Sequence, residues 1–203
     1  MLYYIPADIP KMPKIDDSML NPIDYGAWEM RKLTKSAKED KDKYKPQELR
    51  EEFVKGNREF MEWIEHLPYT DFINVKIHRQ DKSDVPIHID LLWPGRDYEH
   101  YNHLYWNEPC GYRVVMSGQA KQKTYVIGPN MERHYVDMPS DWETNTYIMN
   151  YSTCIHGVDE DPGRDILFFQ FNIDEKKHEK IVRRSIKKYQ KYALCFDMDS
   201  KYG

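Results

Sequence analysis

The stretch from residue 72 to residue 173 is a succession of short runs rich in Ile, Val, Tyr and Phe, each bounded by turn residues. Gly, Pro, Asn and Asp separate the runs, as in Gly128-Pro129-Asn130 and Asp161-Pro162-Gly163. Many short strands at regular spacing predict a mainly β fold, a sandwich or barrel of the jelly-roll type. The runs are Phe72–His78, Ile87–Leu92, Tyr112–Met116, Thr124–Ile127, His134–Met138, Thr146–Tyr151 and Ile166–Ile173.

Amphipathic segments flank this β-rich region. Apolar residues at spacings of three and four predict an N-terminal helix from about Pro46 to His66, ended by Pro68. A second such pattern predicts a C-terminal helix from about Glu175 to Tyr192, with Lys and Arg on its polar face. The stripe of the first helix consists of Leu49, Phe53, Phe60, Ile64 and Leu67.

The first part of the chain has a different character. Four prolines within residues 1–26 predict an irregular arm laid over the core. The charge run from Trp28 to Lys45 predicts a solvated helix or loop. At 203 residues the chain is expected to form one domain, 1–203. Its parts are the arm and helices (1–68), the β core (69–174) and the C-terminal helix with its tail (175–203).

Composition limits the classes of function. Charged residues make up 32% and aromatic residues 14% of the chain, which indicates a globular protein with a very polar surface. The net charge of −4 gives no general attraction to nucleic acid or to an anionic membrane. The three cysteines form no Cys-x-x-Cys pair, which argues against a disulfide framework and a structural zinc site. No leader and no long apolar run is present, so a soluble, cytoplasmic protein is expected.

The segment Pro86–Asp90 carries the most specific chemical signal. In a strand His88 and Asp90 point to the same face, because residues two apart share a face. A second imidazole from His156 completes two His and one carboxylate, which is the metal-ligand set of non-haem Fe(II) oxygenases. The alternative is a hydrogen-bonded structural role for each histidine. His100 and His103 are competing ligands without a matching carboxylate.

An arginine follows the distal histidine at a short interval. Arg164 opens a predicted strand in which Ile166 and Phe168 share its face. Its planar guanidinium can bind a carboxylate through two parallel hydrogen bonds, which an ammonium group cannot do.

The order of these parts resembles the Fe(II)- and 2-oxoglutarate-dependent dioxygenase superfamily. The resemblance implies a double-stranded β-helix with flanking helices. It also implies that His88, Asp90 and His156 are the catalytic metal ligands, and that Arg164 binds the far carboxylate of 2-oxoglutarate. The expected reaction is hydroxylation of an unactivated C–H bond, with release of succinate and CO2.

Within that superfamily the chain is similar to the aspartyl/asparaginyl β-hydroxylase branch, over roughly Pro86–Asp174. The likeness rests on the segments Asn107–Met116 and His156–Asp174, and it implies that Arg113 is a second contact to 2-oxoglutarate. Asp90 is a departure, because that branch commonly has no carboxylate ligand after its first histidine. The implied substrate is an amino-acid side chain, in a free amino acid, a peptide or a protein.

Two other interpretations stay open. One is a cupin-like metal-binding protein or enzyme that does not use 2-oxoglutarate. The other is a jelly roll without catalysis, in which His88 and His156 only pack. The aromatic segment from Trp93 to Pro109 is the predicted substrate lid, since recognition is commonly carried by loops beside a rigid sheet.

Overall fold

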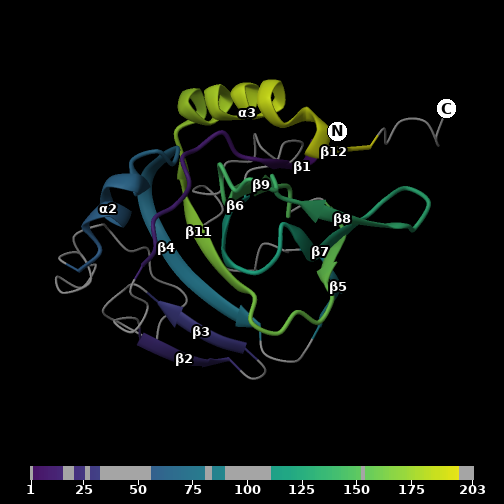
Figure 1. Ribbon diagram of the computed structural model, residues 1–203, viewed down its shortest axis with the longest axis horizontal. Helices are drawn as coiled ribbons and strands as arrows, with labels where there is room; N and C mark the ends of the chain where they lie inside the picture. Colours follow the sequence, from purple (N-terminus) through teal and green to yellow (C-terminus); the bar gives the residue numbers. More distant parts are fainter. Residues whose placement is uncertain are drawn as a thin grey trace.

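The computed structural model describes residues 2–15, 21–25, 28–32, 56–80, 84–89, 111–151 and 154–196 (Figure 1). The protein is mainly β, with antiparallel sheets and helices packed around them. In the described part of the chain, no helix is long and apolar enough to cross a membrane. The elements are β1 Leu2–Pro6, β2 Asn21–Tyr25, β3 Trp28–Lys32, α2 Arg58–Ile64, β4 Tyr69–Gln80, β5 Val85–His88, β6 Gly111–Ser117, β7 Lys121–Ile127, β8 Arg133–Asp137, β9 Thr146–Met149, β10 His156–Val158, β11 Asp165–Ile173, α3 Glu175–Tyr189, the short 3-10 helix η5 Gln190–Tyr192 and β12 Leu194–Cys195.

The strands form a large sheet and a small one. The large sheet has the order β12-β1-β9-β6-β11-β4-β3-β2, and the small sheet has the order β5-β10-β7-β8. All of these neighbours pair antiparallel. Strands from opposite ends of the chain thus lie side by side, as β1 does between β12 and β9.

Successive side chains of the central strands β6, β9 and β11 point to opposite sides of the large sheet, and both sides are buried. One face packs against α2, α3 and the residues after β1. The other face packs against the small sheet, through Val126 of β7 and Val136 of β8. The first face includes Tyr112, Val114, Ile148, Leu167 and Phe169, and the second includes Val115, Tyr147 and Ile166.

Helix α3 is fixed at its start and along one side. Asp174 is its N-cap and accepts a hydrogen bond from the backbone amide of Lys177 at 3.1 Å, which satisfies a donor that the helix itself leaves unpaired. Ile181, Val182 and Tyr189 are buried against the sheet.

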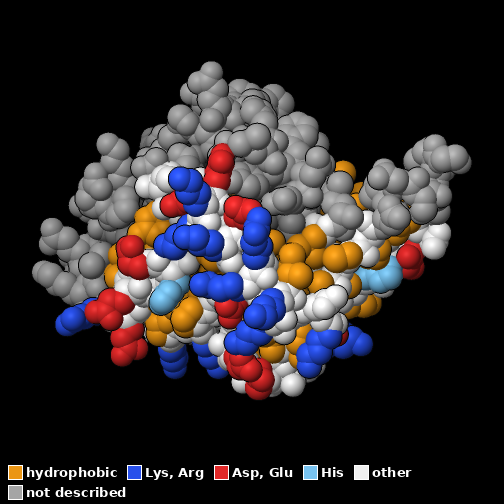
Figure 2. All heavy atoms as spheres, turned by 90° about the horizontal axis from the view of Figure 1, so that it is seen from above, with side chains coloured by type: hydrophobic (Ala, Val, Ile, Leu, Met, Phe, Trp, Pro, Cys, Tyr) orange, Lys and Arg blue, Asp and Glu red, His pale blue; other side chains and the backbone are white. Residues whose placement is uncertain are grey.

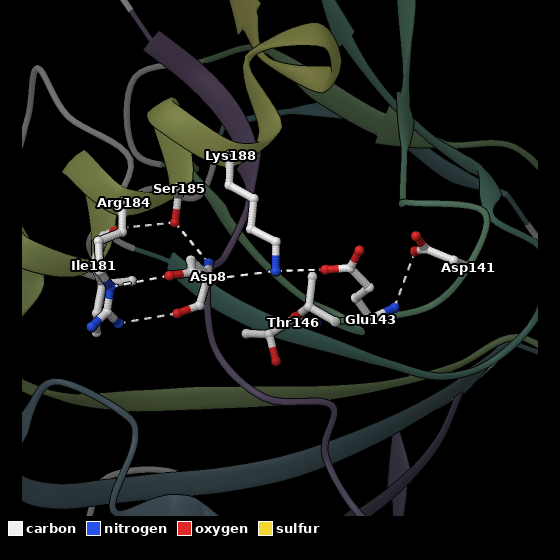
Figure 3. A network of polar contacts seen from close by, with 9 residues as sticks. Asp8, Asp141, Glu143, Thr146, Ile181, Arg184, Ser185 and Lys188 are labelled. Atoms are coloured by element: carbon white, nitrogen blue, oxygen red, sulfur yellow. Dashed lines mark hydrogen bonds and ion pairs between the residues drawn. The ribbon is translucent and has the colours of Figure 1, made fainter.

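Polar contacts of Asp8 attach the segment after β1 to α3 (Figure 3). The Asp8 amide donates to Ser185 Oγ at 2.8 Å, and Arg184 Nε lies 3.1 Å from the Asp8 carboxylate. Lys188 Nζ lies 2.5 Å from Glu143, in the connection between β8 and β9. Three segments distant in the sequence therefore meet at this end of α3.

Several sequence-based predictions are confirmed. The change from helical to strand pattern at Pro68 is present, since β4 begins at Tyr69. The C-terminal helix runs from Glu175 to Tyr189, with the last predicted turn as 3-10 helix. Phe60, Ile64 and Leu67 of the predicted apolar stripe are buried in the core of the large sheet.

The prediction of an irregular arm over residues 1–26 holds in part. Residues 7–15 form no helix or strand and pack on the core, and β2 lies at an edge of the large sheet. Residues Leu2–Pro6, in contrast, form a strand inside the large sheet, because proline stands only at the end of that run and leaves the preceding amides able to pair. Residues Trp28–Lys32 form β3 rather than a solvated helix or loop. The alternation of Trp28 and Met30 with charged residues is a strand pattern that the overall charge run conceals.

Two predicted boundaries also change. Of the predicted Pro46–His66 helix, residues 46–55 lie outside the described ranges. The described part is α2, Arg58–Ile64, which begins after Asn57, whose backbone is non-helical (φ −126°, ψ 46°) and which follows Gly56, another weak helix former. Of the predicted strand Ile87–Leu92, the structure describes β5, Val85–His88, and residues 90–92 lie outside the described ranges. Since β5 lies at the edge of the small sheet, Pro86 is tolerated within it.

Buried His178 predicts loss of stability in acid. The residue is 0% exposed on α3, with Nδ1 2.8 Å from Tyr112 Oη of β6. Burial lowers its pKa from 6.5 to about 4. The unfolded state therefore binds the proton more readily than the folded state. The contribution of neutral His178 to the free energy of unfolding is fully present above pH 6.5 and is lost as the pH falls toward 4. We expect this group to lower the free energy of unfolding by up to about 3 kcal/mol, measured by urea unfolding across that range.

Two variants separate titration from packing. H178Q removes the titrating group, so its stability should depend less steeply on pH than that of the wild type. Y112F removes only the hydrogen bond and should lose about 1 kcal/mol at every pH while the steep dependence remains. An unchanged pH dependence in H178Q would contradict the assignment.

Candidate functional site

Two histidines lie opposite each other on neighbouring strands of the small sheet. His88 is the last residue of β5 and His156 the first residue of β10, and the two are direct partners in the antiparallel register. Directly paired residues project to the same face of a sheet. Val126 of β7 is the other partner of His156 and is fully buried in the core between the sheets. Both imidazoles therefore belong to the face that looks toward the large sheet.

The backbone sets the protonation of both rings in the same way. His88 Nδ1 lies 2.7 Å from the carbonyl oxygen of Pro86, and His156 Nδ1 lies 3.0 Å from that of Cys154. A carbonyl oxygen can only accept, so Nδ1 carries the proton in each ring. In the neutral imidazole the lone pair is then on Nε2, the form in which histidine binds a metal.

The spacing of the rings fits shared coordination of one ion. Their centroids lie 4.3 Å apart, with 53° between the ring planes. Imidazoles bound at right angles, with metal–nitrogen distances of about 2.1 Å, would have centroids about 4.5 Å apart. The distance between the rings and their tautomers are thus compatible with coordination of one ion by both imidazoles.

The remaining predicted ligand is not among the described residues. Asp90, the competing His100 and His103, and the predicted lid Trp93–Pro109 all lie outside the described ranges. Among the residues that the structure does describe, no group of three or more His, Cys, Asp or Glu side chains is positioned to hold a metal.

Arg113 reaches the same region from the large sheet. It lies on β6 beside Phe168 of β11, and its side chain is 8% exposed. The guanidinium carbon lies 3.6 Å from the ring centroid of Phe168 and 4.2 Å from that of Tyr151. Such a sandwich holds the cation through the negative faces of both rings and fixes its plane.

Tyr151 connects this arginine to the histidine pair. Its ring meets that of His156 edge to face, with 4.9 Å between centroids. Its hydroxyl donates to Tyr147 Oη at 3.1 Å. Burial is the main cause that raises the pKa of Tyr151 well above its ordinary value, so the residue stays neutral beside Arg113.

Arg164 enters the space between the sheets from a tight turn. Asp161 accepts a hydrogen bond from the Arg164 amide at 3.1 Å, and Gly163 takes φ +85° after Pro162. Proline followed by a residue with positive φ is typical of a type II turn, which glycine adopts without steric cost. The turn delivers Arg164 directly to the start of β11.

The partners of Arg164 are neutral. Nη2 donates to Thr124 Oγ1 at 2.6 Å and Nε to Gln122 Oε1 at 3.4 Å, both on β7. Arg164 is 5% exposed, and no carboxylate among the described residues is in ion-pair contact with it. A buried cation is costly unless an anion compensates it. The arrangement is therefore suited to an anionic ligand.

Sequence reasoning missed the residues that support these groups. Gln122 and Thr124 alternate with exposed lysines on β7, and both are almost fully buried. Polar residues at the buried positions of an alternating strand are a detectable signal for an internal polar site. For Tyr151 the sequence gives no such signal, because its packing depends on β6 and β10 together.

Comparisons with known proteins assign no family. No family model matches the sequence, and no curated protein matches it. Among solved structures, the chain is similar to the crystal structure of an oxidoreductase of the 2OG-Fe(II) oxygenase family from Burkholderia pseudomallei. The two are 11% identical, with a TM-score of 0.42 over 75% of this chain and 74% of that one.

Gly157 is predicted to be needed for the position of β10. A Cβ at this residue would lie 2.5 Å from Tyr125 Oη and 3.0 Å from the carbonyl oxygen of Val85. We expect G157A to lower the free energy of unfolding by about 1–3 kcal/mol, because the strand must shift to relieve the overlap. Urea unfolding measures the effect.

A second variant identifies the cause. Y125L combined with G157A removes the aromatic side chain that the new methyl group meets, so the double variant should lose less stability than the two single changes added together. Additive losses would show that Tyr125 is not the obstacle.

Proposed function

We propose that the protein is an Fe(II)- and 2-oxoglutarate-dependent dioxygenase, built on a double-stranded β-helix, that hydroxylates an unactivated C–H bond and releases succinate and CO2. The pairing of His88 with His156 is the observation that supports this best. The two rings lie 4.3 Å apart, and both place their Nδ1 proton on a backbone carbonyl. Each ring thereby keeps an unprotonated Nε2, as a metal ligand must keep one free nitrogen, whereas a purely structural role demands no particular tautomer.

In this proposal His88, Asp90 and His156 hold the iron. Two imidazoles and one carboxylate leave several coordination positions open on one side of the ion. Fe(II) and 2-oxoglutarate together supply the oxidising power, and the protein supplies binding, orientation and exclusion of water. The buried core around Val126, which faces His156 across the strand pair, contributes to a dry site.

Arg164 is assigned to the far carboxylate of 2-oxoglutarate. Thr124, its hydrogen-bond partner, lies two residues along β7 from Val126, which pairs with His156. Two residues of a strand span about 7 Å, a suitable separation for a short dicarboxylate with its other end at the metal. The low dielectric of the buried site strengthens the attraction between guanidinium and carboxylate.

Arg113 is assigned as a second cationic contact to 2-oxoglutarate. Its guanidinium is held flat between Phe168 and Tyr151, and Tyr151 touches His156. A fixed guanidinium loses little conformational freedom when a carboxylate binds.

The substrate is proposed to be an amino-acid side chain, in a free amino acid, a peptide or a protein. This assignment follows the resemblance of the segments around Arg113 and His156 to the aspartyl/asparaginyl β-hydroxylase branch. The segment Trp93–Pro109 is proposed to select the substrate, because it is rich in Tyr, Trp and His and follows Asp90 directly.

Metal and cosubstrate binding give the first test. Under anaerobic conditions, Fe(II) and 2-oxoglutarate added together should produce a charge-transfer absorption band, and admission of oxygen should release succinate. H88A and H156A should lose the band and the succinate, because each removes one of two facing ligands. H66A changes an exposed histidine of the chain and should keep both.

The outcomes distinguish the rival interpretations. Metal binding that depends on His88 and His156 but is indifferent to 2-oxoglutarate would favour the cupin-like protein. Absence of binding at saturating Fe(II) would favour a jelly roll without catalysis, and either result would refute the proposal.

Arg164 and its hydroxyl partner are predicted to control the KM for 2-oxoglutarate. R164K keeps the charge but loses the planar pair of donors, so the KM should rise about ten-fold or more while Fe(II) binding persists. T124V should raise it by a smaller factor, since a neutral hydrogen bond is worth about 1 kcal/mol. Steady-state succinate release measures both.

R58M is the matched control, because Arg58 is 87% exposed on α2 and its loss should leave the KM unchanged. Thermal unfolding of each variant checks that the fold is retained. A folded R164K with the KM of the wild type would remove Arg164 from the cosubstrate site.

A further inference from the structure

Helix α3 concentrates positive charge in an otherwise acidic chain. Between Glu175 and Tyr189 it carries seven Lys or Arg residues against two Glu, a net charge of +5. The whole chain has a net charge of −4, so the rest of the chain carries −9. The excess positive charge of α3 is therefore local, and Figure 2 shows several Lys and Arg side chains, with Asp and Glu side chains among them, on the face of the molecule seen from the side of α3.

Four of these cations form a single line. At 3.6 residues per turn, positions 176, 180, 183 and 187 fall on one narrow stripe of α3. All four residues are exposed. The stripe lies opposite the buried face that contains His178, Ile181 and Ser185. This line is called the basic row: Lys176, Lys180, Arg183 and Lys187.

The row is distinct from the cations that serve the fold. Arg184 contacts Asp8 and Lys188 contacts Glu143, and both lie to one side of the row. Within the row Arg183 pairs with Glu179, a neighbour on the same helix. In the described part of the chain, no carboxylate is in ion-pair contact with the other three members.

The composition of the row indicates that its binding partner is a nucleic-acid phosphate backbone rather than a protein surface. Lysine is depleted in protein interfaces, whose centres need aromatic or aliphatic anchors. Ile186, at the margin of the row, is the large hydrophobic residue of α3 that is exposed, at 43%. Contacts to nucleic-acid phosphates, in contrast, need only cations and polar groups.

We propose that the basic row of α3 binds the backbone of double-stranded DNA without sequence preference. From residue 176 to residue 187 the row spans about 16 Å of helix axis. A duplex presents one negative charge per about 1.7 Å of its axis, so several phosphates lie within the length of the row. The total charge predicts no general attraction, so binding is confined to this row.

Salt dependence and a matched pair of variants test the proposal. Fluorescence anisotropy of a labelled mixed-sequence duplex should give a plot of log K against log salt with a slope near −4, and a second sequence should bind equally. K180Q combined with K187Q should weaken binding about ten-fold or more at low salt and make the slope shallower by about 2. K121Q combined with K123Q changes the net charge equally at two exposed residues of β7 and should leave affinity and slope unchanged.

Several results would overturn the assignment. Equal weakening by the two double variants would show that total charge, not the row, governs binding. Binding of a polyglutamate peptide without binding of the duplex at low salt would identify an acidic protein as the partner instead. Circular dichroism confirms that each variant retains α3, so loss of binding reports on the surface.

Discussion

The double burial of the central strands is the constraint on which the rest of the structure depends. Strands β6, β9 and β11 pack against two layers at once, the helices on one face and the small sheet on the other. Their alternation of side chains is therefore fixed, because a slip of one residue would exchange the two cores. Arg113 is carried into the space between the sheets by that same register, since it shares a face with Val115.

The space between the sheets combines an apolar lining with a few strongly polar groups. Tyr151 and Phe168 surround one guanidinium, while Thr124 and Gln122 hold another. The neutral partners of Arg164 orient its guanidinium without cancelling its charge. A folded chain that keeps this arginine more than nine-tenths buried sacrifices stability for it, which is commonly a sign of a ligand-binding role.

The sequence predicts the parts of the molecule that local pattern determines. The strands β6, β7, β8, β9 and β11 and the helix α3 follow from alternation, helical period and turn residues, and Asp161-Pro162-Gly163 forms the turn that its composition indicates. The short strand β10 was not predicted. The place of β1 between β9 and β12 depends on pairing between distant segments, which local pattern does not contain. The contact between His88 and His156 could be proposed from residue types, but their direct register and matched tautomers depend on the small sheet. The support of Arg164 by Thr124 has the same origin.

The pairing of β5 with β10 joins residues far apart in the sequence, so the proposed binding of an ion to both histidines would be coupled to folding. A chain in which β10 has not yet met β5 has two separate imidazoles and no chelating pair. Any ion that needs both rings binds only the closed sheet and stabilises it in proportion to the logarithm of its free concentration. Closing the long loop between β5 and β10 is also slow, because the chain loses conformational entropy before the stabilising contacts between the strands have formed. The small sheet would thus be the part of the protein whose persistence responds to metal supply, while the large sheet, held by α3 and its own core, would not.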